Sequence, residues 1–376
     1  MDTDFRRYKF EDELLLLQTV LEKLGLPKAP AQDAAMAISY ADLFGMQTHG
    51  IECLFTYIDG VEHGRIKPSN APEVLLETPI SAVIDAHQGW GHSSAVYSMK
   101  FAIQKAKNAG IGIVCMKNAN HYGIAGYYPY LAIQEDLIGF TITNTEGMMV
   151  PTGGLEPLLG SNPISCGIPA DPYPFLLDMA TTVVPGGKVA LYRKKGLPLV
   201  EGWAIGRDGK VTTDPAEVQA AVSGKKHGGI APIGGLGTVF GGHNGYGLSL
   251  MVELLTGCMT CSDCSNNIRR FDPYVDNNSE VFMAIDFGLF GDKRAIKDHV
   301  NKYLQTLRNS DPIDPSVPVM THGEREFRHA SFCKKNGVPI LNSTYNMLCE
   351  VLREKWGLDV PSILSPINSD TFLCMQ

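Results

Sequence analysis

The segment 111-IGIVCMKNANHYGIAGYYPYLAIQEDLIGFTIT-143 holds the pattern on which the fold assignment rests. The apolar run 111–116 predicts a buried strand, residues 125–133 predict a helix, and residues 137–143 predict a second strand. The polar loop after the first strand carries His121 and ends at Gly123. A Rossmann fold would place G-x-G-x-x-G after a first strand, at the start of a helix, and the chain has no such motif.

Working outward from this segment, strands and helices mix without the regular alternation of a doubly wound sheet. The first 65 residues are expected to be helical. The pattern therefore favours an α+β fold, with residues 1–70 as a helical region packing with 300–376, residues 71–299 as a sheet-containing region, and residues 300–376 as a helical region. Further helices are expected at 14–24, 31–46, 51–62, 93–108, 188–193, 246–257, 292–308 and 344–355, and further strands at 74–76, 82–85, 164–168, 175–178 and 281–287.

Composition excludes several classes of protein. The 376 residues carry a net charge of −8, which argues against broad nucleic-acid binding because that needs a basic surface. No apolar run approaches the roughly 18–20 residues that span a bilayer, and the N-terminus does not read as a signal peptide. We therefore expect a cytoplasmic protein that does not associate with membranes, and we expect its nine cysteines to be free thiols.

Glycine is enriched and unevenly placed. Residues 147–247 hold 21 of the 39 glycines. Glycine weakens helix interiors, so this stretch is expected to form turns, short strands and places where the backbone approaches a ligand.

Cys258, Cys261 and Cys264 form a C-x-x-C-x-x-C pattern, which on its own suggests a zinc or iron–sulfur site. The fourth cysteine of a ferredoxin-like spacing is missing, because residue 268 is Ile. Small apolar fillers at the end of a helix explain the pattern better, and no metal site is predicted.

Three polar residues are candidates for chemistry. His49 lies between two predicted helices and His121 follows a predicted strand. An imidazole with a pKa near 6.5 suits proton transfer, but a loop histidine can equally hydrogen-bond a backbone carbonyl. Asp178 ends a predicted strand, where it could orient a histidine, contact a ribose hydroxyl or simply cap a turn.

Taken in order, the motifs resemble those of the second type of malate/L-lactate dehydrogenase, a family with relatives that act on ureidoglycolate, diketogulonate, sulfolactate and cyclic imino acids. The matching segments span about residues 40–340. They are Thr48-His49-Gly50 with Tyr57, residues 64–68, 120–123, 125–128, 143–144, 151–154, 159–163, 178–182, 202–204, 212–215, 245–248, 284–286 and 323–326.

The resemblance implies a non-Rossmann NAD(P)-binding fold with a largely antiparallel central sheet and a flanking helical domain, in which residues 71–299 form the cofactor-binding region. It also implies a homodimer, and NAD or NADP as cofactor. The implied reaction moves a hydride between NAD(P) and a small 2-hydroxy or 2-oxo acid, malate- or lactate-like, while a histidine exchanges the proton.

The resemblance also assigns residues by position. His49, His121 and Asp178 are expected to be catalytic, and Thr48, Cys53 and Tyr57 to bind substrate, with the choice between the two histidines open. The expected cofactor contacts are His121, Thr143, Asn144, Pro163, Asp178, Met179, Ala180, Thr181, Thr182, His243, Asn244, Gly245, His322, Gly323 and Glu324.

Two positions depart from the family pattern. Cys53 stands where the family has an Arg that can clamp a substrate carboxylate, and Asn244 stands where it has a Lys. These changes motivate an alternative, in which the chain binds a dinucleotide or another ligand without turnover. Arg269 and Arg270 are candidate replacements for the missing guanidinium.

Overall fold

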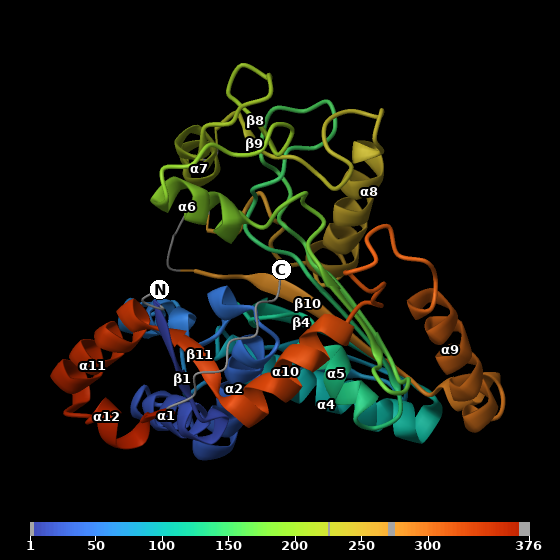
Figure 1. Cartoon of the computed structure of the whole chain (residues 1–376), viewed down its shortest axis with the longest axis horizontal. Coiled ribbons are helices and arrows are strands. Elements are labelled where there is room, and N and C mark those ends of the chain that lie inside the picture. Colours follow the sequence, from blue (N-terminus) through green and yellow to red (C-terminus); the bar gives the residue numbers. More distant parts are fainter. Residues whose placement is uncertain (1–3, 225, 270–274, 368–376) are drawn as a thin grey trace.

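A computed structural model of the chain describes residues 4–224, 226–269 and 275–367 (Figure 1). Its largest sheet has seven strands in the order β2-β3-β4-β10-β5-β6-β7. Only β3 and β4 pair in parallel, and the other neighbours are antiparallel. The strands are β2 (Glu73–Glu77), β3 (Ser81–Asp85), β4 (Ile111–Ala119), β5 (Ile138–Thr143), β6 (Ile164–Ile168), β7 (Phe175–Met179) and β10 (Asn278–Ile285).

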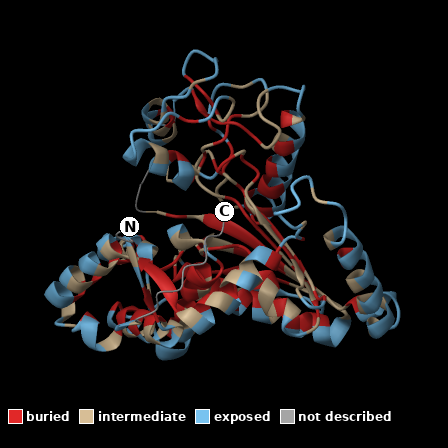
Figure 2. Ribbon diagram, in the orientation of Figure 1, coloured by how far each residue is buried: buried red, intermediate tan, exposed pale blue. Residues whose placement is uncertain are grey.

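Helices cover both faces of this sheet. Successive side chains of a strand point to opposite faces, so Phe282 packs with residues of α4 (Gly91–Ala109) and α5 (Tyr127–Ile133). The neighbouring Val281 packs with Val252 of α8 (Gly242–Glu253). Figure 2 shows the resulting buried layer at the centre of the molecule, with exposed residues on the outer sides of the helices. The expected mixed fold with a large, mostly antiparallel sheet is confirmed.

The two ends of the chain meet in a second sheet. β1 (Phe5–Tyr8) lies between β11 (Val338–Leu341) and β12 (Pro366–Ile367), and pairs antiparallel with both. The prediction that the first 65 residues are helical is therefore wrong at β1, because its partners lie more than 300 residues away and leave no local pattern. The region 300–376, expected to be helical, likewise contains β11 and β12.

Helices from both ends share one apolar cluster. Leu17 and Leu21 of α1 (Phe10–Lys23) and Ile38 of α2 (Lys28–Leu43) belong to it, as does Tyr57 of α3 (Leu54–Glu62). Leu348 of α11 (Asn342–Trp356) and Val360 of α12 (Val360–Ile363) complete it from the other end of the chain. The proposed boundary at residue 300 falls within α9 (Lys293–Arg308), and the three-region division stays a prediction.

Apart from β6 and β7, which belong to the central sheet, much of the glycine-rich stretch lies in the upper lobe in Figure 1. It contains two short helices, α6 (Gly186–Lys194) and α7 (Pro215–Ser223), and the two-residue strands β8 (Ala204–Ile205) and β9 (Gly229–Ile230). This agrees with the turns and short elements expected from its composition.

Short or irregular helices complete the fold. They are η1 (Gln47–His49), η2 (Ile51–Cys53), the π-helical turn η3 (Leu254–Cys258) that extends α8, η4 (Phe287–Phe290) and α10 (Glu324–Asn336). None of the helices in the described part of the chain combines the length and apolar composition that crossing a lipid bilayer requires.

Candidate active site

The end of β4 and the helix α3 bring His121 and Tyr57 together. The chain leaves β4 at Ala119, two residues before His121, and Tyr57 lies on α3 with only 3% of its surface exposed. The Tyr57 hydroxyl lies 3.0 Å from Nδ1 of His121 and 3.4 Å from Nε2 of His92. Since Nδ1 is engaged by the hydroxyl, Nε2 is the nitrogen of His121 that remains for a substrate.

His49 lies on the other side of His121. The ring centroids of the two histidines are 5.6 Å apart, and Thr48 Oγ1 lies 3.0 Å from His49 Nδ1. Burial lowers the pKa of His49, and burial together with the nearby His49 lowers the pKa of His121 to about 3. Both rings are therefore neutral at pH 7, which is the state that accepts a proton.

Cys53 does not act as an anion-binding group here. Its thiol donates a hydrogen bond to the Thr48 carbonyl at 2.8 Å, and burial raises the pKa of the thiol to about 11. The residue therefore stays neutral and holds the turn that carries Thr48 and His49.

Two cavities meet at His121. The first, the Arg65 cavity, has a volume of about 200 Å³, and the second, the Ser161 cavity, about 310 Å³. His121, Arg269 and Asp276 line both. The Arg65 cavity is also lined by Cys53, Thr56, Tyr57, Arg65, Ile66 and Asn120, and the Ser161 cavity by His49, Thr145, Glu146, Met148, Ser161, Pro185, Gly186, Gly187, Ile268 and Asn278.

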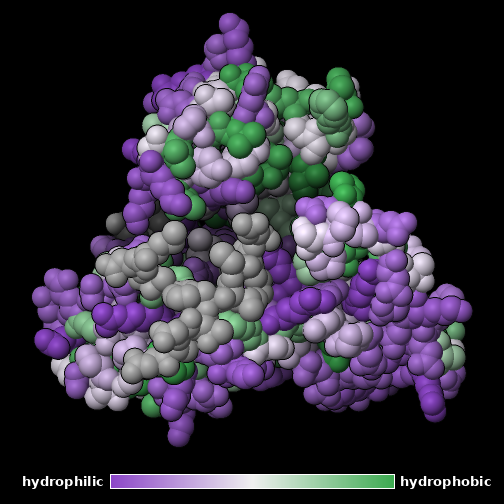
Figure 3. Space-filling view, in the orientation of Figure 1, coloured by the Kyte–Doolittle hydropathy of each residue, from purple (hydrophilic) through white to green (hydrophobic). Residues whose placement is uncertain are grey.

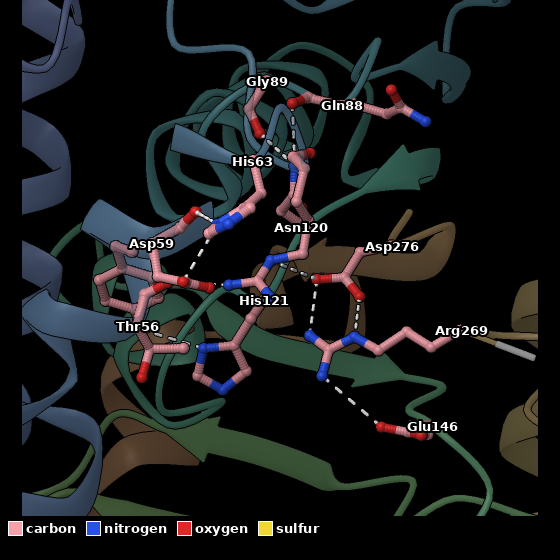
Figure 4. Close-up of polar contacts among 12 residues, drawn as sticks. Thr56, Asp59, His63, Gln88, Gly89, Asn120, His121, Glu146, Arg269 and Asp276 are labelled. Atoms are coloured by element: carbon pink, nitrogen blue, oxygen red, sulfur yellow. Dashed lines mark hydrogen bonds and ion pairs between the residues drawn. The ribbon is translucent and has the colours of Figure 1, made fainter. Parts of the chain in front are cut away.

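A charged cluster lies between the two cavities. Arg269 binds the Asp276 carboxylate through Nε and Nη2, the second contact at 2.8 Å, while its Nη1 lies 3.5 Å from Glu146 (Figure 4). Arg65 Nε lies 3.8 Å from the same Asp276 carboxylate. Asp276 therefore faces two guanidinium groups, and the Arg65 cavity carries more positive than negative charge.

Asp178 lies in a third cavity rather than beside the histidines. Its carboxylate accepts a hydrogen bond from the Gly126 N–H at 2.7 Å, and burial raises the pKa of Asp178 to about 6. This His322 cavity has a volume of about 210 Å³. Its lining residues are Phe44, Met46, Gly126, Leu176, Asp178, Met320, Thr321, His322, Gly323, Arg325 and Glu326. Phe44 and Met46 shortly precede His49, so the turn after α2 runs from this cavity to the histidines.

The start of α10 forms one wall of the His322 cavity. Gly323 has φ +91° there, and a Cβ atom on it would lie 2.8 Å from the Leu176 side chain. The first N–H groups of a helix lack intrahelical acceptors and attract anionic groups such as phosphate. Arg325 adds a positive charge, and the Asp178 and Glu326 carboxylates can accept hydrogen bonds from hydroxyls. This donor and acceptor set fits part of a dinucleotide.

Glu324 is placed differently. It is 2% exposed, its carboxylate pairs with Arg308 at 2.9 Å and also binds Arg328, and it does not line the cavity. Its side chain therefore anchors the start of α10.

The other expected cofactor residues fall into two groups. Thr143, Asn144, Thr181 and Thr182 are buried; Asn144 donates to Glu253 at 3.0 Å, and Thr181 donates to the Ser161 carbonyl at 2.9 Å. Pro163, Met179 and Ala180 are partly buried, His243 and Asn244 are exposed in the first turn of α8, and Gly245 is buried against the Ile233 backbone.

Sequence reasoning missed several residues of the site. Arg65 and Asn120 stood inside matched segments without a role, and Asp276 and Glu253 carried no local signal. Glu253 accepts hydrogen bonds from Asn144, Asn162 and Ser265, which ties α8 to the loops around the Ser161 cavity. Of the two candidate replacement arginines, Arg269 lines the site, and Arg270 lies outside the described residues.

The cysteine cluster lies at the end of α8. The Sγ atoms of Cys258 and Cys264 are 3.5 Å apart. Among the described residues, no group of three or more His, Cys, Asp or Glu side chains could hold a metal ion.

Comparison with known proteins places this geometry in a family. Residues 8–349 match the malate/L-lactate dehydrogenase family model. The chain is 38% identical to malate dehydrogenase from Pyrococcus horikoshii, over 94% of this chain and 96% of that protein. It is also 38% identical to L-sulfolactate dehydrogenase from Methanocaldococcus jannaschii, over 94% of this chain and 98% of that protein.

Solved structures agree with the sequence comparison. The crystal structure of malate dehydrogenase from Entamoeba histolytica superposes with a TM-score of 0.90 at 33% identity, covering 95% of this chain and 99% of that one. The chain therefore belongs to the malate/L-lactate dehydrogenase family.

Proposed function

We propose that the chain is an NAD(P)-dependent oxidoreductase that interconverts a small 2-hydroxy acid and its 2-oxo acid, malate- or lactate-like. The observation that carries this proposal is the hydrogen bond between Tyr57 and His121 beside two cavities that hold charged groups suited to an acid substrate. The family membership and the names of the relatives support the same reaction.

His121 moves the proton in this proposal. In the oxidation of the alcohol, C2 loses a hydride and the hydroxyl loses its proton, which the neutral His121 accepts at Nε2. For Nε2 to accept this proton, Nδ1 carries the ring proton and donates its hydrogen bond to the Tyr57 hydroxyl oxygen, which holds the ring. His49 contributes to the site from the Ser161 cavity. Thr48 and Cys53 keep the turn with His49 in place.

The His322 cavity is the proposed place for part of the cofactor. A bound nicotinamide dinucleotide supplies the hydride donor or acceptor. The start of α10 offers N–H groups for phosphate, and Asp178 offers a carboxylate for a hydroxyl. The binding mode is then non-Rossmann, in keeping with the missing glycine fingerprint. NAD and NADP both remain candidates.

The alternative of a dinucleotide-binding protein without turnover rested on Cys53 and Asn244. It is not supported, because relatives at 37–38% identity over most of the chain are named malate or L-sulfolactate dehydrogenases. The Arg65 cavity also contains guanidinium groups despite Cys53.

A homodimer is part of the proposal. After its polar first turn, α8 and the following η3 carry apolar residues on both sides: Val252 is buried, while the exposed side carries leucines and methionines from Leu248 to Met259, which is 71% exposed. Figure 3 shows apolar residues gathered over the lobe that carries α8. A helix that is apolar all round is normally buried, so we infer that a second copy covers this face. The proposal also includes a cytoplasmic location for the protein.

Steady-state kinetics with NADH and NADPH test the function. Wild-type protein should oxidise one of them in the presence of a 2-oxo acid from a panel that includes pyruvate, oxaloacetate and sulfopyruvate. His121→Gln should lower kcat by about 10²- to 10⁴-fold, the usual contribution of a general acid or base. The proposal fails if no 2-oxo acid on the panel supports turnover, or if His121→Gln and His49→Gln both retain full activity.

A further inference from the structure

The Arg65 cavity raises the question of which group receives the carboxylate of the substrate. Cys53, which lines this cavity, is a neutral thiol already bonded to Thr48. A carboxylate taken from water into a small cavity needs a charged or strongly hydrogen-bonding partner. Among the described residues, Arg65 and Arg269 are the guanidinium groups that line it.

Their other contacts distinguish the two arginines. Arg65 is buried and donates through Nη2 to the Thr56 carbonyl at 2.8 Å, which fixes it to α3. Arg269 is held through Nε and Nη2 by Asp276, and its Nη1 reaches only the longer contact of 3.5 Å with Glu146. Glu146 lines the Ser161 cavity and not the Arg65 cavity. Nη1 of Arg269 thus makes the longest of the contacts of this guanidinium, and it makes it on the side of the Ser161 cavity, which meets the Arg65 cavity at Arg269 and His121.

The charge balance points the same way. In the Arg65 cavity two guanidinium groups face one carboxylate, that of Asp276, which is 2% exposed. Glu146, at 3.5 Å from Nη1 of Arg269, supplies the second negative charge of the cluster, so a substrate carboxylate that takes the place of Glu146 at Nη1 keeps the two guanidinium groups balanced.

We propose that Arg269, held in place by Asp276, binds the carboxylate of the 2-oxo acid, and that Nη1 exchanges Glu146 for this carboxylate when substrate enters. His121, which like Arg269 lines both cavities, then faces the carbonyl oxygen next to that carboxylate. Figure 4 shows Arg269 reaching Asp276 and Glu146, with His121 and Asn120 beside this cluster. The inference rests on the proposed function and assigns to Arg269 the binding of the substrate carboxylate, which the neutral thiol of Cys53 cannot perform.

Substitutions at Arg269 and at Glu146 should change KM for the 2-oxo acid in opposite directions. Arg269→Gln should raise KM for the 2-oxo acid at least about tenfold, because a charge-assisted bond is lost, and should leave KM for the reduced cofactor unchanged. Glu146→Gln weakens the competing contact and should lower KM for the 2-oxo acid. Arg353→Gln removes an exposed charge on α11 and should change neither KM for the 2-oxo acid nor KM for the reduced cofactor.

A guanidinium introduced at position 53 should restore part of the substrate affinity that Arg269→Gln loses. Cys53→Arg places one on the wall of the same cavity, so the Cys53→Arg/Arg269→Gln variant should recover part of the lost affinity. Binding of oxamate, an unreactive 2-oxo acid mimic, measured by calorimetry with reduced cofactor present, should follow the same order without depending on turnover. A neutral 2-oxo amide should not distinguish Arg269→Gln from wild type.

The outcomes separate the inference from the proposed function. Failure of the wild type to reduce any 2-oxo acid overturns the function. Turnover in the wild type, with unchanged KM and oxamate affinity in Arg269→Gln, overturns the role of Arg269. If Arg269→Gln does not fold, Arg269→Lys is the second variant, because lysine keeps the positive charge but cannot make the two parallel hydrogen bonds of a guanidinium. An unaltered KM for the 2-oxo acid in Arg269→Lys, together with a raised KM in Glu146→Gln, contradicts the inference.

Discussion

The Tyr57 hydroxyl lies 3.0 Å from Nδ1 of His121, and this hydrogen bond sets which nitrogen of the imidazole faces the cavities. Tyr57 comes from α3 and His121 from the loop after β4, so the contact joins the N-terminal helices to the central sheet. The relation makes Tyr57 a positioning residue for His121.

Tyr57→Phe should therefore lower kcat about tenfold while leaving KM for the cofactor unchanged. The substitution removes one hydrogen bond of about 1–1.5 kcal/mol and lets the imidazole change tautomer and turn. Steady-state kinetics measure the effect, and Tyr97→Phe, at an exposed position on α4, is the matched control. An unchanged kcat in Tyr57→Phe would show that the hydroxyl does not position His121.

Asp42 should make stability depend on pH. The Asp42 carboxylate accepts the Ile51 N–H at 2.7 Å and is buried next to Glu13, and burial raises the pKa of Asp42 to about 7 from its usual 3.8. Between these values the folded state binds more protons than the unfolded state, so the free energy of unfolding falls as pH rises. Asp42→Asn should become more stable relative to wild type, by on the order of 2–4 kcal/mol, between pH 4 and 8.

Denaturant unfolding at several pH values tests this difference. Asp33→Asn, on the same helix but paired with Lys100 at the surface, should show no such gain. Parallel pH profiles for wild type and Asp42→Asn would contradict the expectation.

Gly323→Ala should weaken cofactor binding. Gly323 has φ +91°, and the added methyl group would meet Leu176 at the wall of the His322 cavity. We expect KM for the reduced cofactor to rise about tenfold or more, since a clash or shift there displaces the first N–H groups of α10. Gly357→Ala, with φ +64° and open space around it, imposes a similar backbone cost away from the cavity. Equal cofactor KM values in the two variants would remove the His322 cavity from the cofactor site.

Leu254→Glu should dissociate the proposed dimer. Leu254 is 51% exposed on the apolar side of η3, and a buried unpaired carboxylate there would cost several kcal/mol. Light scattering after size-exclusion chromatography should give twice the chain mass for wild type and the chain mass for the variant. Leu15→Glu, at an exposed leucine of α1, should remain dimeric. A monomeric wild type would contradict the α8 interface.

Sequence alone could predict the elements whose signals are local. The apolar runs that became β4, β5 and β6 and the stripe of α1 matched closely, because burial of one face repeats within a few residues. β1 could not be found this way, since its exposed and buried residues make sense only beside β11 and β12. For α8, the sequence placed the start four residues late, because glycine and polar residues open the helix.

The candidate site likewise contains residues that the sequence could predict and residues that it could not. His49, His121 and Tyr57 lie in recognisable motifs, and the structure brings them together. The cluster of Arg65, Asp276 and Arg269 joins residues about 200 positions apart, so no spacing rule could identify it. Asp178 was expected to act on a histidine or on the cofactor, and its place in the His322 cavity favours the second of these roles.

The most direct test of the central claim follows the hydride itself. Reduced cofactor deuterated at both C4 positions of the nicotinamide is incubated with the protein and a 2-oxo acid, and the product is examined by mass spectrometry. We expect a 2-hydroxy acid that carries one deuterium at C2, formed by wild type and lost to background in His121→Gln. Absence of product, or product without deuterium at C2 from cofactor labelled at both C4 positions, would contradict the account.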